Sequence, residues 1–202
     1  MASFEVISAR PLDARLLQLV GISRATTEAH YRLYQGYVAK RNEILAGLDG
    51  VDLEQANQVY SELRSLKLDL TFAIGAIKNH EVYFGHLGGD GGSPNGAFGR
   101  LVERDFGSVD RWRADLRATG LAGRGWAWTA FDWDEGRLRN LLGDAQNTYP
   151  IWNATPLVAL DVHEHAYFLD YQTDRASYID AFFENLDWDA VNGWIESYRI
   201  PS

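Results

Sequence analysis

Two long segments in the first half of the chain carry hydrophobic residues at helical spacing. The first runs from Ser23 to about Ala46, and Ser23 is placed to cap its start. The second runs from Leu53 to about His86. Its apolar face is predicted to consist of Val59, Leu63, Leu66, Leu70, Ile74 and Ile77. Only the short stretch GLDGVD separates the two segments, which predicts an antiparallel helical hairpin.

The pattern changes after the glycine-rich stretch GGDGGSPNG, residues 88–96, because so many glycines and a proline leave no regular structure there. We therefore divide the chain into a helical hairpin domain, residues 1–88, and a second domain, residues 94–202. The second domain begins with two short helical patterns, PNGAFGRLVERDFG and SVDRWRADLRATG, and Ser108 is expected to cap the second of them.

Strand patterns follow these two helices. GWAWTAFDWDEGRLRNLLGD has strand-like aromatic and β-branched content, and its turn residues Asp134, Glu135 and Gly136 predict a β-hairpin. TPLVALDV, residues 155–162, is a third apolar strand. Two further helices, with Asp174 and Asp187 as N-caps, close the chain. Helices followed by a small sheet flanked by helices indicate the α+β class.

Composition narrows the choice of function. The 202 residues are 46% hydrophobic, enough for a packed core, and the net charge of −9 argues against nucleic-acid binding. Cysteine is absent, which excludes disulfides, thiolate metal sites and cysteine nucleophiles. The sequence shows neither a signal-peptide pattern nor an apolar run of membrane-spanning length. We therefore expect a soluble cytoplasmic protein without membrane partners.

The segment DVHEHAYFLDY, residues 161–171, concentrates groups that bind metals. Asp161 and His165 lie one helical turn apart, whereas Asp161, His163 and His165 share a face only in an extended segment. Local spacing does not choose between these alternatives. His30 and His80 lie in the two long helical patterns, so three elements each offer a ligand. Three imidazoles and one carboxylate suit iron or manganese with an open coordination position.

Four segments resemble the iron/manganese superoxide dismutase family, in the family's own order. They are EAHYRLYQGYV (28–38), KNHEVYF (78–84), GRGWAWT (123–129) and DVHEHAYFLDYQTDRASYIDAFF (161–183). The resemblance implies a helical hairpin followed by an α/β domain with a three-stranded antiparallel sheet. It also implies an enzyme that disproportionates superoxide at one manganese or iron ion per subunit.

The resemblance further implies a set of site residues. The metal ligands would be His30, His80, Asp161 and His165. His163 stands where the family has tryptophan and would line the site. The family places a glutamine near the bound solvent, either on the second helix, where this chain has Ala76, or on the sheet hairpin. Gln146 would fill the hairpin position, the arrangement typical of manganese enzymes, with Asn147 as the alternative.

The first helix departs from the family pattern. It lacks the two later histidines and is one residue shorter, so we expect a regular helix rather than one with a π-bulge. Tyr37 then returns to the face of His30 and is assigned as the gateway tyrosine, with Tyr34 as the alternative. On the first strand, Trp126 is expected to face the pocket and Trp128 to face outward. His86 is expected at the surface.

The resemblance also implies a homodimer, with Glu164 and Tyr167 at the interface and Glu164 reaching the partner's ligand histidine. A second hypothesis remains open, because His163 and Phe84 both replace family tryptophans and the helix histidines are missing. In it, the chain keeps the dismutase fold but serves as a metal-binding or structural interaction protein with little dismutase activity.

Overall fold

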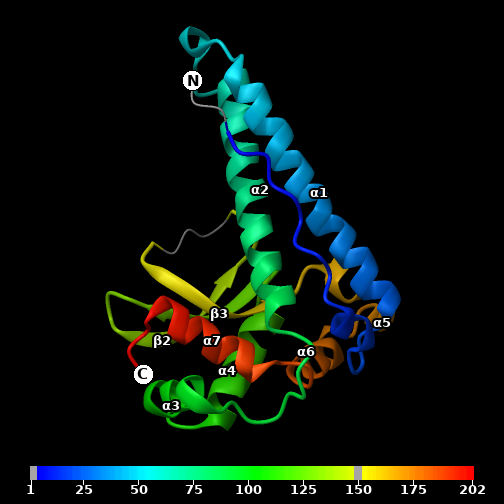
Figure 1. Ribbon diagram of the computed structural model, residues 1–202, viewed down its shortest axis with the longest axis vertical. Helices are drawn as coiled ribbons and strands as arrows, with labels where there is room; N and C mark the ends of the chain where they lie inside the picture. The colour runs from blue at the N-terminus through cyan, green and yellow to red at the C-terminus, as the bar shows by residue number, and fades with distance from the viewer. Residues whose placement is uncertain (1–3, 148–151) are drawn as a thin grey trace.

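A long helical hairpin projects from a broader part that contains a small sheet (Figure 1). The computed structural model describes residues 4–147 and 152–202. α1 (Arg24–Asp49) is α-helical along its whole length, as predicted, and begins at Ser23, whose side chain accepts a hydrogen bond from the backbone N–H of Thr26. α2 (Glu62–Gly85) returns beside it.

The predicted start of the second helix at Leu53 is wrong. Leu53–Gln55 form only a short 3-10 turn, η2, and α2 starts at Glu62. The side chain of Asn57 accepts hydrogen bonds from the backbone N–H groups of Val59 and Tyr60, which ties the chain into a turn. Two residues predicted for the apolar face are exposed: Val59 is 62% exposed and Ile74 is 37% exposed.

The first two elements after the hairpin are the expected short helices, α3 (Gly96–Phe106) and α4 (Val109–Ala122). Gly107 separates them with a φ of 82°, a left-handed conformation that glycine adopts without strain. Ser108 caps α4 by accepting a hydrogen bond from the backbone N–H of Arg111, which confirms the predicted cap.

The sheet has three antiparallel strands, β1 (Trp126–Asp132), β2 (Arg137–Gly143) and β3 (Ala154–Asp161), in the order β2-β1-β3. This confirms the α+β fold with its three-stranded sheet. Trp126 opens the central strand and is paired with Gly143 on one side and Asp161 on the other. The register therefore brings the last residues of β2 and β3 to the same end of the sheet, on either side of Trp126.

Five further short elements complete the described fold. They are η1 (Ala14–Gln18), η3 (Glu164–Ala166), α5 (Phe168–Tyr171), α6 (Arg175–Phe183) and α7 (Trp188–Tyr198). The side chains of Asp174 and Asp187 cap α6 and α7, as predicted. The core between the sheet and its helices is rich in aromatic rings. The largest fully buried side chains include Trp112, Trp126, Tyr178, Phe98, Phe131, Phe182 and Phe183.

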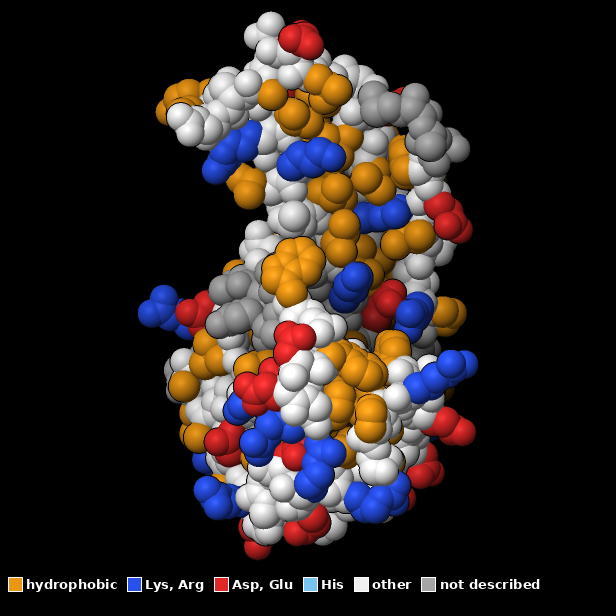
Figure 2. Space-filling view, turned by 90° about the vertical axis from the view of Figure 1, so that its left-hand side faces the viewer, with side chains coloured by type: hydrophobic (Ala, Val, Ile, Leu, Met, Phe, Trp, Pro, Cys, Tyr) orange, Lys and Arg blue, Asp and Glu red, His pale blue; other side chains and the backbone are white. Residues whose placement is uncertain are grey.

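The N-terminal segment lies along the hairpin (Figure 1). Asn42 of α1 holds it by exchanging two hydrogen bonds with the backbone of Ile7. Hydrophobic side chains continue along the hairpin surface, while charged residues of both signs are interspersed over the wider end (Figure 2). Within residues 4–147 and 152–202, none of the helices has both the length and the apolar character needed to cross a membrane.

Candidate metal centre

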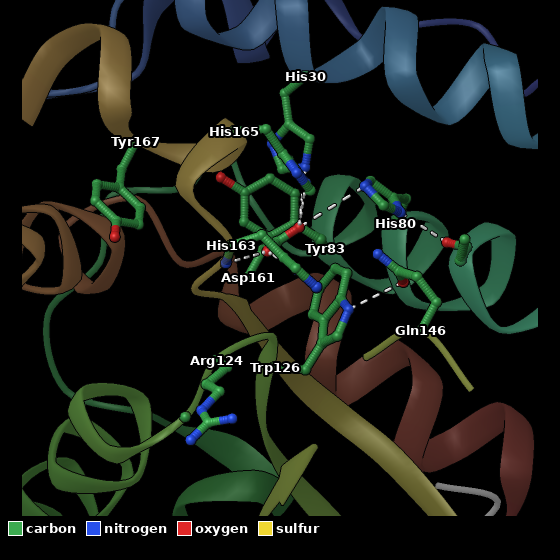
Figure 3. Close-up of polar contacts among 12 residues, drawn as sticks. His30, His80, Tyr83, Arg124, Trp126, Gln146, Asp161, His163, His165 and Tyr167 are labelled. Carbon is green, nitrogen blue, oxygen red and sulfur yellow. Dashed lines mark hydrogen bonds and ion pairs between the residues drawn. The ribbon is translucent and has the colours of Figure 1, made fainter. Parts of the chain in front are cut away.

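Four side chains converge on one buried point between the hairpin and the sheet (Figure 3). His30, His80, Asp161 and His165 each offer one ligand atom, and these four atoms all lie within 4.8 Å of one another. The Oδ2 atom of Asp161 lies 3.1 Å from Nε2 of His30, 3.2 Å from Nε2 of His165 and 3.7 Å from Nε2 of His80. A carboxylate and three imidazoles thus point inward from α1, α2 and the segment that follows β3.

The end of β3 determines how Asp161 and His165 are placed. Asp161 is the last residue of the strand, and its Oδ1 accepts a hydrogen bond of 2.9 Å from the backbone N–H of His163. This turn leads into η3 (Glu164–Ala166), which brings His165 back over the carboxylate. Neither alternative describes the whole segment: Asp161 ends the extended strand, a bend follows at His163, and only Glu164–Ala166 are helical.

The two helices of the hairpin supply His30 and His80, both almost fully buried. Nδ1 of His80 lies 2.7 Å from the carbonyl oxygen of Ala76 one turn earlier, so this nitrogen carries the proton. Nε2 of His80 then has its lone pair free, and it has no hydrogen-bond partner among the described residues. A buried acceptor left in this state fits a metal ligand, because coordination would satisfy it.

Electrostatics favour the protonation states that metal ligands require. Burial lowers the pKa of His80 to about 3 and also lowers the pKa of His30, so both rings are neutral. Burial would raise the pKa of Asp161, but hydrogen bonds from His163, His165 and His30 outweigh it and hold that pKa well below its usual range. Burial acts to lower the pKa of His165, but the contact with Asp161 prevails and raises it.

A second group of side chains lies beside this cluster. Gln146 is 3% exposed, and its Oε1 accepts a hydrogen bond of 3.0 Å from the indole N–H of Trp126. The ring of Trp126 meets that of His80 edge to face, with centroids 5.3 Å apart. Asn147, the alternative to Gln146, is exposed, and its side-chain amide points to Thr71 instead.

The two candidate tyrosines differ in their surroundings. The ring of Tyr37 lies 5.6 Å from that of His80. Burial and the charge of Asp161 raise the pKa of Tyr37, and a hydrogen bond from Gln146 opposes this rise. The hydroxyl of Tyr34 instead accepts the backbone N–H of Arg10 and donates to Glu81, away from the cluster. The structure thus brings Tyr37, not Tyr34, beside His80 and close enough to Gln146 for that amide to affect its pKa.

Two expectations about the surroundings are wrong. Trp128 is only 6% exposed, and its ring stacks on that of Trp126 at 6.3 Å, because residues two apart on a strand share one face. His86 is fully buried rather than at the surface, and its Nε2 accepts a hydrogen bond of 2.8 Å from the backbone N–H of Ala159. A histidine just beyond the end of a helix gives no periodic signal of burial.

His163 gives the centre a polar neighbour. Its Nδ1 donates to Oδ1 of Asp161 at 2.8 Å, beside the bond from its own backbone N–H. Its ring stacks on that of His165 with centroids 5.0 Å apart. The two hydrogen bonds from His163 therefore fix the carboxylate of Asp161 through Oδ1 and leave Oδ2 to face the cluster.

Phe84, the other replacement of a family tryptophan, packs against the ring of His30 at 5.1 Å.

This donor set could hold one metal ion between a helical hairpin and a sheet, and comparison with known proteins gives the family. Residues 94–193 match the family described as iron/manganese superoxide dismutases, C-terminal domain. A protein of Aquifex aeolicus named superoxide dismutase (Fe) is 44% identical over 179 residues, which cover 86% of this chain and 84% of that protein. The chain belongs to the iron/manganese superoxide dismutase family.

Relatives named for either metal are similar over most of the chain. A superoxide dismutase (Fe) of Cupriavidus metallidurans is 38% identical, covering 89% of this chain and 91% of its own. A superoxide dismutase (Mn) of Listeria monocytogenes is 32% identical, covering 84% of this chain and 87% of its own.

Proposed function

We propose that the protein is a superoxide dismutase, which disproportionates superoxide to dioxygen and hydrogen peroxide at one manganese or iron ion per subunit. The observation that carries the proposal is the convergence of His30, His80, Asp161 and His165 on one buried point in a chain of this family. Members named for iron and for manganese both resemble the chain, so either metal is included in the proposal.

The ligand atoms suit such an ion. The neutral imidazole of His80 and the ionised carboxylate of Asp161 are ready to coordinate, and neutral His30 needs only to carry its proton on its other ring nitrogen. His165 has a raised pKa, so binding of a cation would displace any proton that it shares with Asp161. The metal, when bound, supplies the one-electron oxidation and reduction that dismutation needs.

The surrounding residues would manage protons and orientation. Tyr37 lies beside His80, next to the hydrogen-bonded pair of Gln146 and Trp126, and these side chains form a series that can order solvent in the pocket. Tyr37 is half-buried at the outer end of this series and is proposed as the gateway for superoxide and protons. His163 is proposed to tune the centre through its hydrogen bond to Asp161.

A direct test combines metal content with activity. We expect the purified protein to contain about one manganese or iron ion per chain and to remove superoxide, and we expect the metal-free protein to be inactive. Anomalous scattering from crystals of the native protein would identify the metal. Full metal occupancy without dismutation would contradict the proposed activity while leaving the metal site intact.

The second hypothesis, a metal-binding protein with little dismutase activity, draws on the polar His163 where the family has tryptophan. Two hydrogen bonds to Oδ1 of Asp161 withdraw charge from the carboxylate and favour the reduced metal. The midpoint potential of the bound metal discriminates between the hypotheses. Dismutation must run both half-reactions, so a potential far from midway between them would favour the second hypothesis.

Assembly and location are further parts of the proposal. Glu164 and His165 border a surface that also includes Leu33, Phe168 and Leu169, which are 40%, 46% and 64% exposed. We propose that a second copy of the chain covers this apolar surface in a homodimer and that Tyr167 supports it from within, since its ring is only 4% exposed. A cytoplasmic location is proposed as well and is tested by cell fractionation.

A further inference from the structure

Gly75 lies on α2, five residues before His80. The turn after β2 packs against the helix at this position. A Cβ atom added at Gly75 would lie 2.1 Å from the backbone oxygen of Gln146 and 3.0 Å from its carbonyl carbon. Separations below 3.0 Å are not tolerated, and the nearby atoms belong to backbone rather than to a flexible side chain. Any residue other than glycine would therefore push the turn away from α2.

The turn that packs against Gly75 carries Gln146, which lies beside the proposed metal centre through its contact with Trp126. With its backbone oxygen against α2, Gln146 directs its side-chain oxygen toward the indole N–H of Trp126 (Figure 3). A hydrogen bond from the amide of Gln146 also acts to lower the pKa of Tyr37. The other contacts of the turn lie at its ends. Asp144 accepts the backbone N–H of Arg124 at 3.1 Å, and Asn147 reaches Thr71 across 3.5 Å.

The same part of α2 also orients a proposed ligand. The carbonyl of Ala76, next to Gly75, accepts the Nδ1 proton of His80 at 2.7 Å. One turn of α2 thus orients the ring of His80 through the carbonyl of Ala76, and through Gly75 it sets how closely Gln146 approaches the helix. The two contacts use different atoms, so a side chain at position 75 would displace Gln146 without removing the bond to His80.

We propose that Gly75 is a positioning residue of the metal centre. Because glycine has no side chain, residues 144–147 can pack closely against α2. This close packing sets how far the amide of Gln146 lies from the metal. The inference rests on the proposed function, because it assigns Gly75 to the pocket of that same site.

If Gly75 mattered only as a residue of the helix, replacing it with alanine would be expected to stabilise the protein and to leave the metal centre unchanged, which is the opposite of what we expect. Glycine inside a helix is less favourable than alanine, so Gly→Ala normally stabilises a helix. Gly193, inside α7, provides the matched control, because an added Cβ there meets nothing within 4 Å among the described residues. Gly193→Ala should leave activity unchanged.

The experiment compares Gly75→Ala, Gln146→Ala, the double variant and Gly193→Ala as metal-loaded proteins. The readouts are metal content, the indole N–H signal of Trp126 in NMR spectra, the midpoint potential of the metal, and kcat and KM separately. We expect Gly75→Ala to keep its metal, to shift the Trp126 signal, and to move the potential in the same direction as Gln146→Ala. We expect kcat to fall roughly tenfold or more.

The double variant tests whether Gly75 acts through Gln146. Once the amide has been removed, Gly75→Ala should change kcat and the potential little further, since both substitutions disturb one interaction. Additive effects in the double variant would overturn the proposal. So would an unchanged Trp126 signal and potential in Gly75→Ala.

A second variant covers the case in which Gly75→Ala does not fold. Asp144→Ala removes an exposed side chain that holds the other end of the turn, and it leaves α2 untouched. It should shift the Trp126 signal and the potential in the same direction as Gln146→Ala. If neither the Trp126 signal nor the potential shifts, the proposal that the packing of this turn sets the position of Gln146 is wrong. Wild-type protein with metal but no dismutation would instead count against the proposed function.

Discussion

The two oxygens of Asp161 have different partners, and this division organises the centre. Oδ1 takes both donors of His163, the backbone N–H at 2.9 Å and the ring Nδ1–H at 2.8 Å. Oδ2 faces His30 and His165 at 3.1 and 3.2 Å. A carboxylate anchored through one oxygen offers the other in a fixed direction, which is what a preorganised ligand needs.

This division predicts different results for the two neighbouring histidines. His165→Ala removes one of four proposed ligands and should abolish metal binding at micromolar metal. His163→Ala leaves the backbone bond to Oδ1 in place, so it should retain the metal and change the rate or its pH profile, by roughly tenfold. Metal analysis and steady-state assays of both variants test this. Loss of metal in His163→Ala with retention in His165→Ala would reverse the assignment.

Buried His86 predicts a dependence of stability on pH. It packs against the rings of Tyr83, Phe182 and Trp194, and the nearby charged group is Asp187. Burial lowers the pKa of His86 to about 4, from 6.5 in the unfolded chain. Between these values the unfolded chain binds more protons, so the stabilisation is complete above pH 6.5 and is lost as the pH falls toward 4.

The difference in pKa corresponds to roughly 3 kcal/mol of unfolding free energy. His86→Gln cannot titrate, so its unfolding free energy should fall less steeply between pH 6.5 and 4 than that of the wild type. Urea unfolding at several pH values measures both slopes, and the other four histidines are common to the two proteins. Parallel slopes would show that His86 does not carry this dependence.

At the scale of elements, the sequence predicted best where a short polar residue directly precedes an apolar pattern. Ser23, Ser108, Asp174 and Asp187 each cap the helix that they were assigned, because a side-chain oxygen can satisfy a free backbone N–H only at a helix start. The β-hairpin was predictable for a similar reason, since its turn residues interrupt a strand pattern.

The start of α2 shows where prediction from the hydrophobic pattern fails. Apolar residues from Leu53 onward continue the helical spacing, but Asn57 binds two backbone N–H groups of its own loop. A local side-chain bond of this kind competes with the helix and leaves no trace in the hydrophobic pattern. The contact between Gly75 and Gln146 was invisible for another reason: it joins residues 71 positions apart through backbone atoms.

Because α2 starts at Glu62, its N-cap is Ser61, and the contribution of this cap to stability can be tested. Ser61 accepts a hydrogen bond from the backbone N–H of Arg64 at 3.1 Å and is mostly buried. Ser61→Ala should lower the unfolding free energy by about 1 kcal/mol. Ser197→Ala, an exposed serine whose hydroxyl bonds within α7, is the control and should have a smaller effect. An unchanged stability in Ser61→Ala, measured by urea unfolding, would mean that the helix does not depend on this cap.

At the scale of the whole molecule, the centre joins parts that are distant in sequence. His30 and His80 come from the hairpin, and Asp161 and His165 come from the end of the sheet, so the site forms only when the two parts pack together. A bound metal would therefore stabilise the packed state, because its ligands are not assembled in the unfolded chain.

The surface beside His165 extends this argument to a second copy of the chain. Glu164 is exposed at the start of η3, next to the ligand position and beside the apolar side chains of Phe168 and Leu169. A carboxylate at this place could accept a hydrogen bond from a ligand histidine of a facing subunit, because a two-fold contact places the same surface on both sides. Each subunit would then orient a ligand of its neighbour.

Glu164→Ala should accordingly weaken the dimer and loosen metal binding together, since a histidine N–H in the interface would lose its acceptor. Leu169→Ser, in the same surface but without a polar contact to offer, should weaken the dimer and affect metal affinity only as far as the dimer dissociates. Glu196→Ala, an exposed glutamate on α7, is the control for charge alone. Sedimentation and metal content, measured at the same protein concentration, separate these cases. A dimer of wild-type strength with full metal in Glu164→Ala would mean that Glu164 does not bridge the subunits.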